Sequence, residues 1–456
     1  MKLIHRNIPI FDELINKQTF DKKKKYRLTN FAFVHPYDNG YLIHNNLTKQ
    51  FVYLTEEEYN NILNNEELIE DWLLVPEDFN DKQFSDQVRS LLALIQKPSK
   101  AINHYTIFTT TDCNARCFYC YEKGIKKMHM PHKVAEDVGK YIIDHCNNEK
   151  ITITWFGGEP LYNQDAIDTI CNILNDAHID FTSKMISNSY LFDESLVDRA
   201  VKSWHLKSIQ ITLDGTEKLY NKTKHYIYDN VNAFERVFNN IKTIVSREIK
   251  VTIRLNITSK NAVDLGLLID KIHDEIGVYD NLMIYVHTLY ESTGLKQDEA
   301  NMQPIFEMAE KLQNKIYDYG YSKKNYLSYV LKQNACMSDN DKAITILPMG
   351  QIGKCEHYNS DGFCGSIYKD KFDEDVIAQF KEQRQRWEKC NSCVLYPICF
   401  RLKVCSEKNE CVEIVRQQSI SRFYTSMENS YNYYINNNES LFDNETEVQC
   451  EDTEDC

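Results

Sequence analysis

Cysteine is absent from the start of this chain: none of its 15 cysteines precedes Cys113. Three of them lie in residues 113–120 and eight in residues 336–411. The first residues also lack the uninterrupted apolar stretch of a secretory signal, so a reducing, cytoplasmic location is expected. In such a compartment, clustered cysteines indicate metal binding rather than disulfides.

Basic residues are not in excess either. The formal net charge of −14 makes nucleic acid an unlikely partner class, because phosphate binding needs a basic face. No run of about 18 apolar residues occurs, so no membrane span is expected. The length of 456 residues allows more than one domain. Glycine is scarce, at 14 residues, which makes the adjacent pair Gly157-Gly158 informative.

Residues 1–100 predict a small winged-helix-like domain. Strand patterns at residues 41–44 and 50–54 flank a polar turn, which predicts a hairpin. Thr55 and Glu58 then form the pattern of a capping box at the start of a helix.

Residues 101–320 alternate short apolar strands with helical periodicity, which predicts an α/β domain, a partial (β/α)6 TIM-like barrel. The expected strands are residues 105–110, 151–156, 183–187, 208–213, 251–257 and 282–287. The expected helices include residues 132–146, 166–177, 233–246 and 262–275. Cys146 and Cys171 fall on the apolar faces of two of these helices and are expected in the core.

The carboxyl ends of such strands carry the active site. Polar or small residues recur there on successive strands: Gly157, Gly158, Glu159, Ser187, Asn188, Asp214, Arg254, Asn256 and His287. Two glycines allow close backbone approach to a ligand. The Glu159 carboxylate and nearby carbonyls suit a ligand ammonium group.

The strongest motif is CxxxCxxC, formed by Cys113, Cys117 and Cys120 directly after the first barrel strand. Three thiolates on one loop leave the fourth iron of a 4Fe–4S cubane open for a chelating substrate, whereas structural sites are normally closed by four ligands. The alternative is a zinc loop that takes a distant fourth ligand.

This motif, together with Gly-Gly-Glu-Pro at 157–160 and Ile-Thr-Leu-Asp-Gly at 211–215, resembles the radical S-adenosylmethionine (SAM) superfamily over residues 104–290. The resemblance implies that the three cysteines ligate a SAM-cleaving 4Fe–4S cluster. It also implies SAM contacts for eight residues: Tyr119 against adenine; Gly157, Gly158 and Glu159 at the methionine amino group; and Ser187, Asn188, Asp214 and Arg254 near the carboxylate and ribose. The family's usual His-Asp-x-x-Arg is replaced here by residues 220–224, which end in Lys224.

The C-terminal cysteines resemble those of the SPASM domain, expected at residues 321–425. The resemblance implies two auxiliary 4Fe–4S clusters, one held by Cys390, Cys393, Cys399 and Cys411 and the other by Cys336, Cys355 and Cys405. Cys364 could add a ligand or be a buried apolar residue. Lys403 stands where the family usually has a cysteine, and a zinc ribbon is the alternative for residues 390–405. Residues 426–456 are expected to form a helical end and an acidic, disordered tail that contains Cys450 and Cys456.

These resemblances imply a radical SAM peptide maturase that installs a thioether in a ribosomally made precursor peptide. The N-terminal domain is similar to RiPP recognition elements, which bind leader peptides by strand addition. The expected reducing partner is a flavodoxin or ferredoxin. The alternatives are a sulfatase-activating, formylglycine-generating enzyme, a carbon–carbon crosslinking enzyme, and a non-catalytic, metal-stapled peptide-binding protein.

Overall fold

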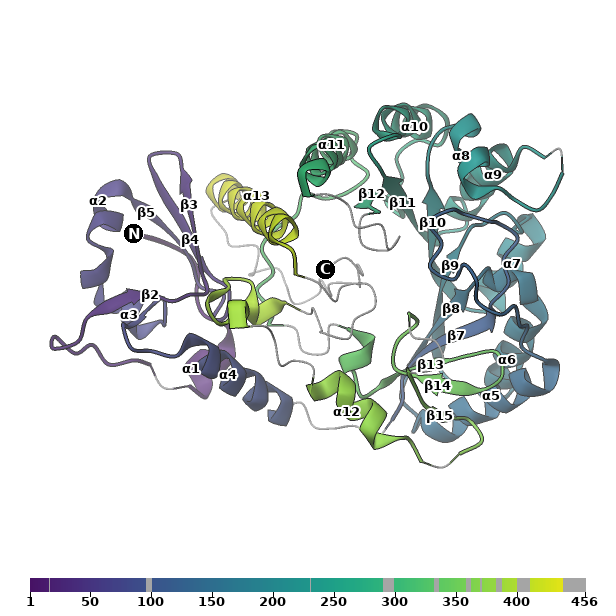
Figure 1. The fold of residues 1–456 in the computed structure, drawn as a ribbon, viewed down its shortest axis with the longest axis horizontal. Helices are drawn as coiled ribbons and strands as arrows, with labels where there is room; N and C mark the ends of the chain where they lie inside the picture. Colours follow the sequence, from purple (N-terminus) through teal and green to yellow (C-terminus); the bar gives the residue numbers. More distant parts are fainter. Residues whose placement is uncertain are drawn as a thin grey trace.

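The computed structural model describes residues 1–15, 17–95, 101–229, 231–289, 299–331, 336–357, 362–369, 371–382, 388–399 and 411–437. Figure 1 shows the N-terminal sheet and the large parallel sheet at opposite ends of the molecule. Predictions for Lys403, Cys405, Cys450, Cys456 and the tail from residue 439 lie outside the described residues.

The N-terminal residues form a four-stranded sheet with the order β1-β5-β4-β3. Its strands are β1 (Lys2–His5), β3 (Ala32–Tyr37), β4 (Gly40–Asn45) and β5 (Phe51–Thr55), and β2 (Tyr26–Leu28) pairs separately with β6 (Leu74–Pro76). The helices are α1 (Pro9–Glu13), α2 (Glu56–Asn60), α3 (Glu66–Glu70) and α4 (Asp81–Ile95). The predicted hairpin is confirmed by the pairing of His44 with Phe51, and the capping box by the reciprocal bonds of Thr55 and Glu58.

The second region is a parallel sheet with the order β12-β11-β10-β9-β8-β7. Its strands are β7 (His104–Thr110), β8 (Ile151–Gly157), β9 (Phe181–Ser187), β10 (Leu206–Leu213), β11 (Lys250–Ile257) and β12 (Leu282–Thr288). Its helices are α5 (His132–His145), α6 (Gln164–Asp176), α7 (Glu194–Lys202), α8 (Glu217–Lys224), α9 (Ala233–Val245), α10 (Ala262–Glu275) and α11 (Glu299–Asp318). The six predicted strands are confirmed, and Cys146 and Cys171 lie in the core between sheet and helices, as predicted. In Figure 1 the helices line the outer side of the sheet, and its inner side faces the N-terminal sheet.

The parallel array is open rather than closed. The outer edge of β7 pairs with β13 (Ala343–Ile346), which continues antiparallel into β14 (Gln351–Gly353) and β15 (Phe363–Ser366). Within the described residues, β7 and β12 are therefore not neighbours. One edge of the sheet is thus extended by the C-terminal region that carries the later cysteines.

The remaining C-terminal helices are α12 (Glu374–Glu382) and α13 (Glu413–Asn437). Helix α13 packs on the N-terminal sheet, where Phe423 stacks on Phe33 with ring centroids 4.6 Å apart. His35 on the same strand contacts Glu428 at 2.7 Å between Nε2 and Oε1. The C-terminal helix thus shares a core with the first 60 residues (Figure 1). None of the helices in the described ranges is long and apolar enough to cross a bilayer.

Replacing Phe33 with alanine should lower the free energy of unfolding by about 3–5 kcal/mol, because it removes a fully buried ring from the face that binds α13. Ile435→Ala is the matched control on α13, since Ile435 is 45% exposed and should change stability by less than about 0.5 kcal/mol. Denaturant titration measures both. Equal, small effects would show that α13 does not depend on this contact.

Candidate functional site

The polar residues at the strand ends meet at one edge of the parallel sheet, as predicted. Ser187 at the end of β9 donates to Glu159 after β8, with 2.7 Å between Oγ and Oε1. Asn256 on β11 donates to Asp214 after β10, with 3.0 Å between Nδ2 and Oδ1. Side chains from four neighbouring strands are therefore joined pairwise at the carboxyl edge.

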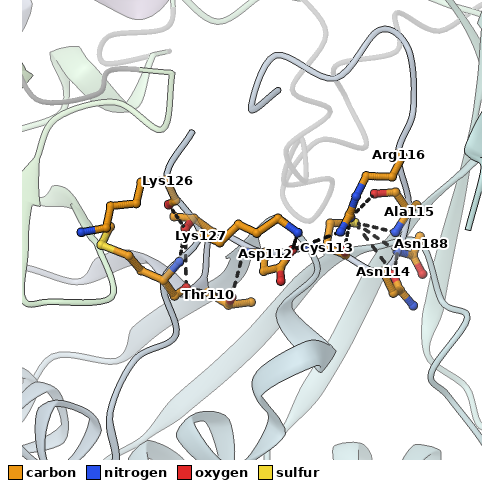
Figure 2. Close-up of polar contacts among 11 residues, drawn as sticks. Thr110, Asp112, Cys113, Asn114, Ala115, Arg116, Lys126, Lys127 and Asn188 are labelled. Atoms are coloured by element: carbon orange, nitrogen blue, oxygen red, sulfur yellow. Dashed lines mark hydrogen bonds and ion pairs between the residues drawn. The ribbon is translucent and has the colours of Figure 1, made fainter. Parts of the chain in front are cut away.

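Residues 111–128, here called the cysteine loop, begin at this edge of the sheet and return to it. The backbone N–H of Thr111 donates to the Met128 carbonyl at 2.9 Å, and Thr110 forms an isolated antiparallel bridge with His129. Between these ends, Asp112 accepts from the Cys113 backbone N–H at 2.8 Å and pairs with Lys127, also at 2.8 Å (Figure 2). The two ends of the loop are thus paired like the strands of a hairpin. This pairing fixes the position of Cys113 relative to the sheet.

Each end of the CxxxCxxC segment is tied to a different strand end. Asn188, after β9, lies close to Cys113 and donates from Nδ2 to Oδ1 of Asn114 at 2.6 Å (Figure 2). The carbonyl of Lys224, at the end of α8, accepts from the Arg116 backbone N–H at 2.8 Å, and the Cys117 thiol lies 4.0 Å from that carbonyl. The three thiols are held on one loop between these two supports.

The environment of the thiols disfavours free thiolates. Burial, followed by the negative charge of Glu159, raises the pKa of Cys113 to about 12. Burial also raises the pKa of Cys120 to about 11 and that of Cys117 above its usual value. Neighbouring thiols contribute to the rise at Cys113, which shows that the three sulfurs lie close enough to repel one another as anions. Such sulfurs ionise when a metal takes up their charge.

The glycine pair at the end of β8 is required by the cysteine loop itself. A Cβ at Gly157 would lie far inside van der Waals contact with the Thr110 carbonyl oxygen, and one at Gly158 would do so with that of Asp112. Gly157 also has φ of +116°, which side chains rarely adopt. The backbone N–H groups of Gly158 and Glu159 donate into the loop at 3.1 and 3.0 Å. The sequence indicated close approach to a ligand, and the structure shows close approach to the loop.

Glu159 is fully buried, with 0% of its surface exposed. Its carboxylate accepts from the Ser187 hydroxyl at 2.7 Å, the Asn188 backbone N–H at 2.7 Å and the Leu161 backbone N–H at 3.2 Å. Burial raises the pKa of Glu159 to about 7 despite these bonds. The carboxylate therefore joins the ends of β8 and β9, and the backbone carbonyls of this segment are left as the groups that suit an ammonium ligand.

A second buried network joins the cysteine loop to β10 and α8. Tyr119 donates its hydroxyl proton to Asp214 at 2.6 Å, and Lys224 lies 2.8 Å from that hydroxyl and 3.0 Å from Asp214 Oδ2. Arg254 donates to Asn256 at 3.0 Å. Through Asn256, Arg254 is connected to Asp214. Lys224, whose sequence context departed from the family pattern, is thus the cation that neutralises Asp214.

Four of the C-terminal cysteines lie close together in the described residues. Cys390 lies in η5 (Glu388–Ser392), and Cys393 follows it and donates its backbone N–H to the Cys390 carbonyl at 3.1 Å; Cys399 follows η6 (Tyr396–Ile398), and the Cys411 carbonyl accepts from Lys389. Burial chiefly raises the pKa of Cys393, and the charges of Cys399 and Cys411 add to the rise, so these sulfurs are neighbours.

Cys355 lies elsewhere, beside the cysteine loop: His357 donates its backbone N–H to the Cys355 thiol at 3.4 Å, and its ring lies 4.4 Å from that of Tyr121. The Cys336 thiol lies 3.0 Å from the Ser338 hydroxyl. Cys364 is 2% exposed in the main core, so it packs as an apolar residue.

The donor sets consist of cysteine thiols, the ligands that iron–sulfur clusters use. No three His, Cys, Asp or Glu side chains in the described ranges are gathered closely enough to hold one metal ion. In a cubane each thiolate binds a different iron, so the sulfurs stand farther apart than around one ion. The cysteines at residues 113–120 and 390–411 could supply such thiolates.

Comparison with known proteins decides the family. Residues 107–263 match the model of the radical SAM superfamily. These residues form a radical SAM domain. The match covers the cysteine loop, the glycine pair and the networks around Glu159 and Asp214.

Among curated relatives, an uncharacterized protein, MJ0907, of Methanocaldococcus jannaschii is 30% identical over 118 residues, which are 25% of this chain and 40% of that protein. A GTP 3',8-cyclase of Alkaliphilus metalliredigens is 35% identical over 25% of this chain and 36% of its own length. The chain thus spans less than half of the length of such relatives. The radical SAM cyclopropyl synthase TigE of Paramaledivibacter caminithermalis is 21% identical over 70% of both chains.

Among solved structures, anSMEcpe with bound AdoMet superposes with a TM-score of 0.56 at 15% identity, over 73% of this chain and 98% of that one. SuiB of Streptococcus suis bound to S-adenosylmethionine gives a TM-score of 0.50 at 16% identity, over 87% and 99%. At these identities the likeness establishes the fold: a radical SAM α/β fold built on a parallel sheet.

Sequence reasoning missed some members of the site. Asn114 is fully buried inside the CxxxCxxC motif, and its carbonyl accepts from the Ile227 backbone N–H at 2.9 Å. Burial raises the pKa of Glu122 to about 7, although the charge of the nearby His357 acts in the opposite direction. The position of Asn114 between two ligands was a usable signal. The contact between residues 122 and 357 has no local sequence signal.

Gly158→Ala should displace the cysteine loop, because the added methyl group meets the backbone of Asp112. We expect reconstituted protein to lose about four irons, the content of one cubane. Gly266→Ala is the control, because its methyl group would meet Leu312 at an ordinary 3.6 Å. Iron analysis of both variants checks this; a Gly158→Ala protein with the wild-type iron content would refute the packing argument.

Glu159 predicts a pH dependence of stability in metal-free protein. Its pKa rises on folding from 4.5 to about 7, so between these pH values the folded state holds a proton that the unfolded state has lost. Stability therefore decreases as pH rises through this window. In denaturant titrations from pH 5 to pH 8, the free energy of unfolding should fall more steeply for wild type than for Glu159→Gln. Parallel curves would show that folding does not raise the pKa of Glu159.

Proposed function

We propose that this radical SAM enzyme is a peptide maturase that installs a thioether crosslink in a ribosomally made, cysteine-containing precursor peptide. The observation that carries the enzymatic part is the cysteine loop, whose three thiols are fixed at the carboxyl edge of the parallel sheet between Asn188 and Lys224. When bound there, a 4Fe–4S cluster would supply the electron that splits SAM into methionine and a 5'-deoxyadenosyl radical, while auxiliary clusters would supply an acceptor for the electron released on crosslinking.

The residues of this chain would bind and orient SAM. Cys113, Cys117 and Cys120 are the proposed metal ligands. The carbonyls at residues 157–158 are the proposed contacts of the methionine amino group. Glu159 fixes the same segment by accepting a hydrogen bond from the Asn188 backbone N–H. Asn188 and the Asp214–Lys224 pair lie on either side of the loop, where they suit the carboxylate and ribose of SAM.

Further SAM contacts belong to the same proposal. Ser187 donates to Glu159 and Arg254 donates to Asn256, so each would position SAM indirectly, by holding the residue to which it donates. Tyr119 donates its hydroxyl proton to Asp214, which holds its ring in place, and in this proposal that ring packs against the adenine. Residues held by so many hydrogen bonds lose little freedom when a ligand arrives, which favours a productive orientation.

The peptide part of the proposal rests on the N-terminal domain, residues 1–100. In the described residues, β3 ends the N-terminal sheet and pairs on one side only, with β4. A free strand edge can bind an extended peptide by strand addition, as RiPP recognition elements do. The winged-helix-like assignment is part of this proposal. So is the SPASM assignment of residues 321–425, with auxiliary clusters at Cys390, Cys393, Cys399 and Cys411 and at Cys336, Cys355 and Cys405.

The thioether product is tested with a short cysteine-containing peptide encoded beside this chain, co-expressed with it under anaerobic conditions. Bond formation between a cysteine sulfur and a carbon removes two hydrogen atoms and consumes the thiol. The modified peptide should therefore be lighter by that mass and no longer react with iodoacetamide. A lighter peptide that still alkylates fully at every cysteine would refute the thioether.

The match to TigE, over 70% of both chains, favours a second product, a cyclopropane ring formed within one side chain. That reaction also removes two hydrogens but leaves every cysteine free, so the same alkylation distinguishes the two. Oxidation of a sulfatase peptide to formylglycine, the alternative raised by the likeness to anSMEcpe, an anaerobic sulfatase maturase, would instead yield an aldehyde that a hydrazide captures.

Lys224→Met should lower the rate of 5'-deoxyadenosine formation at least about tenfold, because Asp214 would lose its buried counter-ion and repel the SAM carboxylate. Lys222→Met, an exposed change on the same helix, should leave the rate unchanged. Mass spectrometry of deoxyadenosine with dithionite and SAM measures both. Equal rates for the two variants would remove Lys224 from the site.

A further inference from the structure

Within the part of the chain that the structure describes, Lys49 is a buried cation that no carboxylate neutralises. It lies in the turn between β4 and β5, and only 2% of its surface is exposed. Its ammonium donates to the side-chain oxygen of Asn46 at 3.2 Å, and within the described residues it has no carboxylate partner. Burial, followed by the charge of Arg89, lowers the pKa of Lys49 to about 7. An ammonium in such a place is costly unless a negative charge stands near it.

The carboxylates on neighbouring elements are already bound by other donors. Asp71 accepts from Gln50 at 3.0 Å, and Asp86 on α4 binds Lys82 at 2.8 Å. Arg89, one helical turn after Asp86, donates to the carbonyl of Pro397, which lies between Cys393 and Cys399 in the chain. Two cations from the N-terminal domain, Lys49 and Arg89, thus converge near residues 390–399.

The turn that carries Lys49 packs directly on that cysteine segment. Asn46, which holds the Lys49 ammonium through its oxygen, donates through its Nδ2 to the carbonyl of Val394 at 3.0 Å. Val394 directly follows Cys393 in the chain. Leu47 belongs to the apolar cluster on which Cys390 packs. Two hydrogen bonds through one side chain therefore separate the ammonium from the backbone beside a proposed cluster ligand.

We propose that Lys49, supported by Arg89, is the counter-charge of the iron–sulfur cluster held by Cys390, Cys393, Cys399 and Cys411, so that the N-terminal domain completes the electrostatic site of this cluster. A cubane with four thiolate ligands carries net negative charge, which would give Lys49 the anion that the described residues do not supply. A fixed positive charge nearby stabilises the reduced, more negative state and raises the reduction potential. This inference rests on the auxiliary-cluster part of the proposed function.

The test is a redox titration of anaerobically reconstituted full-length protein, followed by electron paramagnetic resonance, after iron has been counted. Lys49→Met keeps the length of the side chain and removes the charge, so the midpoint potential of one auxiliary cluster should shift to a more negative value. Lys49→Arg should keep the wild-type potential. Lys17→Met removes a cation that is 55% exposed in the same domain and should cause no shift.

If Lys49→Met instead loses about four irons while Lys49→Arg retains them, the charge is needed to load the cluster, which also supports the proposal. Wild-type iron and potential in Lys49→Met would overturn it, and so would a Lys49→Arg protein that behaves like Lys49→Met. Wild type with iron only at residues 113–120 would refute the auxiliary clusters themselves, whether or not SAM is cleaved, so the two failures are distinguishable.

Discussion

The close contact between the end of β8 and the cysteine loop is the constraint on which the site depends. Gly157 and Gly158 let two backbones meet where no side chain fits, and Glu159 fastens the same segment to β9. Because the loop is held against the sheet in this way, its three thiols stand at the carboxyl edge beside the Asp214 network. The positions of the proposed ligands, of the proposed SAM contacts and of the residues that support them depend on that one packing arrangement.

The buried lysines of this acidic protein are a second feature of the structure. The net charge is −14, yet two of the lysines buried in the described residues, Lys224 and Lys354, lie near thiols. Lys224 pairs with Asp214 and offers its carbonyl to the cysteine loop, and Lys354 precedes Cys355 and donates to the carbonyls of Asn340 and Ala343 at 2.6 Å. Buried cations near thiolates favour the charged form of the sulfur and of any cluster bound there.

Local patterns were sufficient to predict much of this fold. The capping box of Thr55 and Glu58, the six strands, and the core positions of Cys146 and Cys171 follow from period, spacing and side-chain type. The function of Glu159 as a clamp was not foreseen, because its partners lie about 28 residues away on the next strand. The pairing of β13 with β7 and the docking of α13 on β3 depend on contacts far apart in sequence, which no local period encodes.

The most direct test of this account is the formation of 5'-deoxyadenosine from SAM and dithionite by anaerobically reconstituted protein. Wild type should hold about twelve irons and form deoxyadenosine, since three cubanes are expected. A protein with Cys113→Ala, Cys117→Ala and Cys120→Ala should keep about eight irons and form none. Iron-loaded wild type that leaves SAM intact, or a triple variant that cleaves it as fast as wild type, would contradict the account.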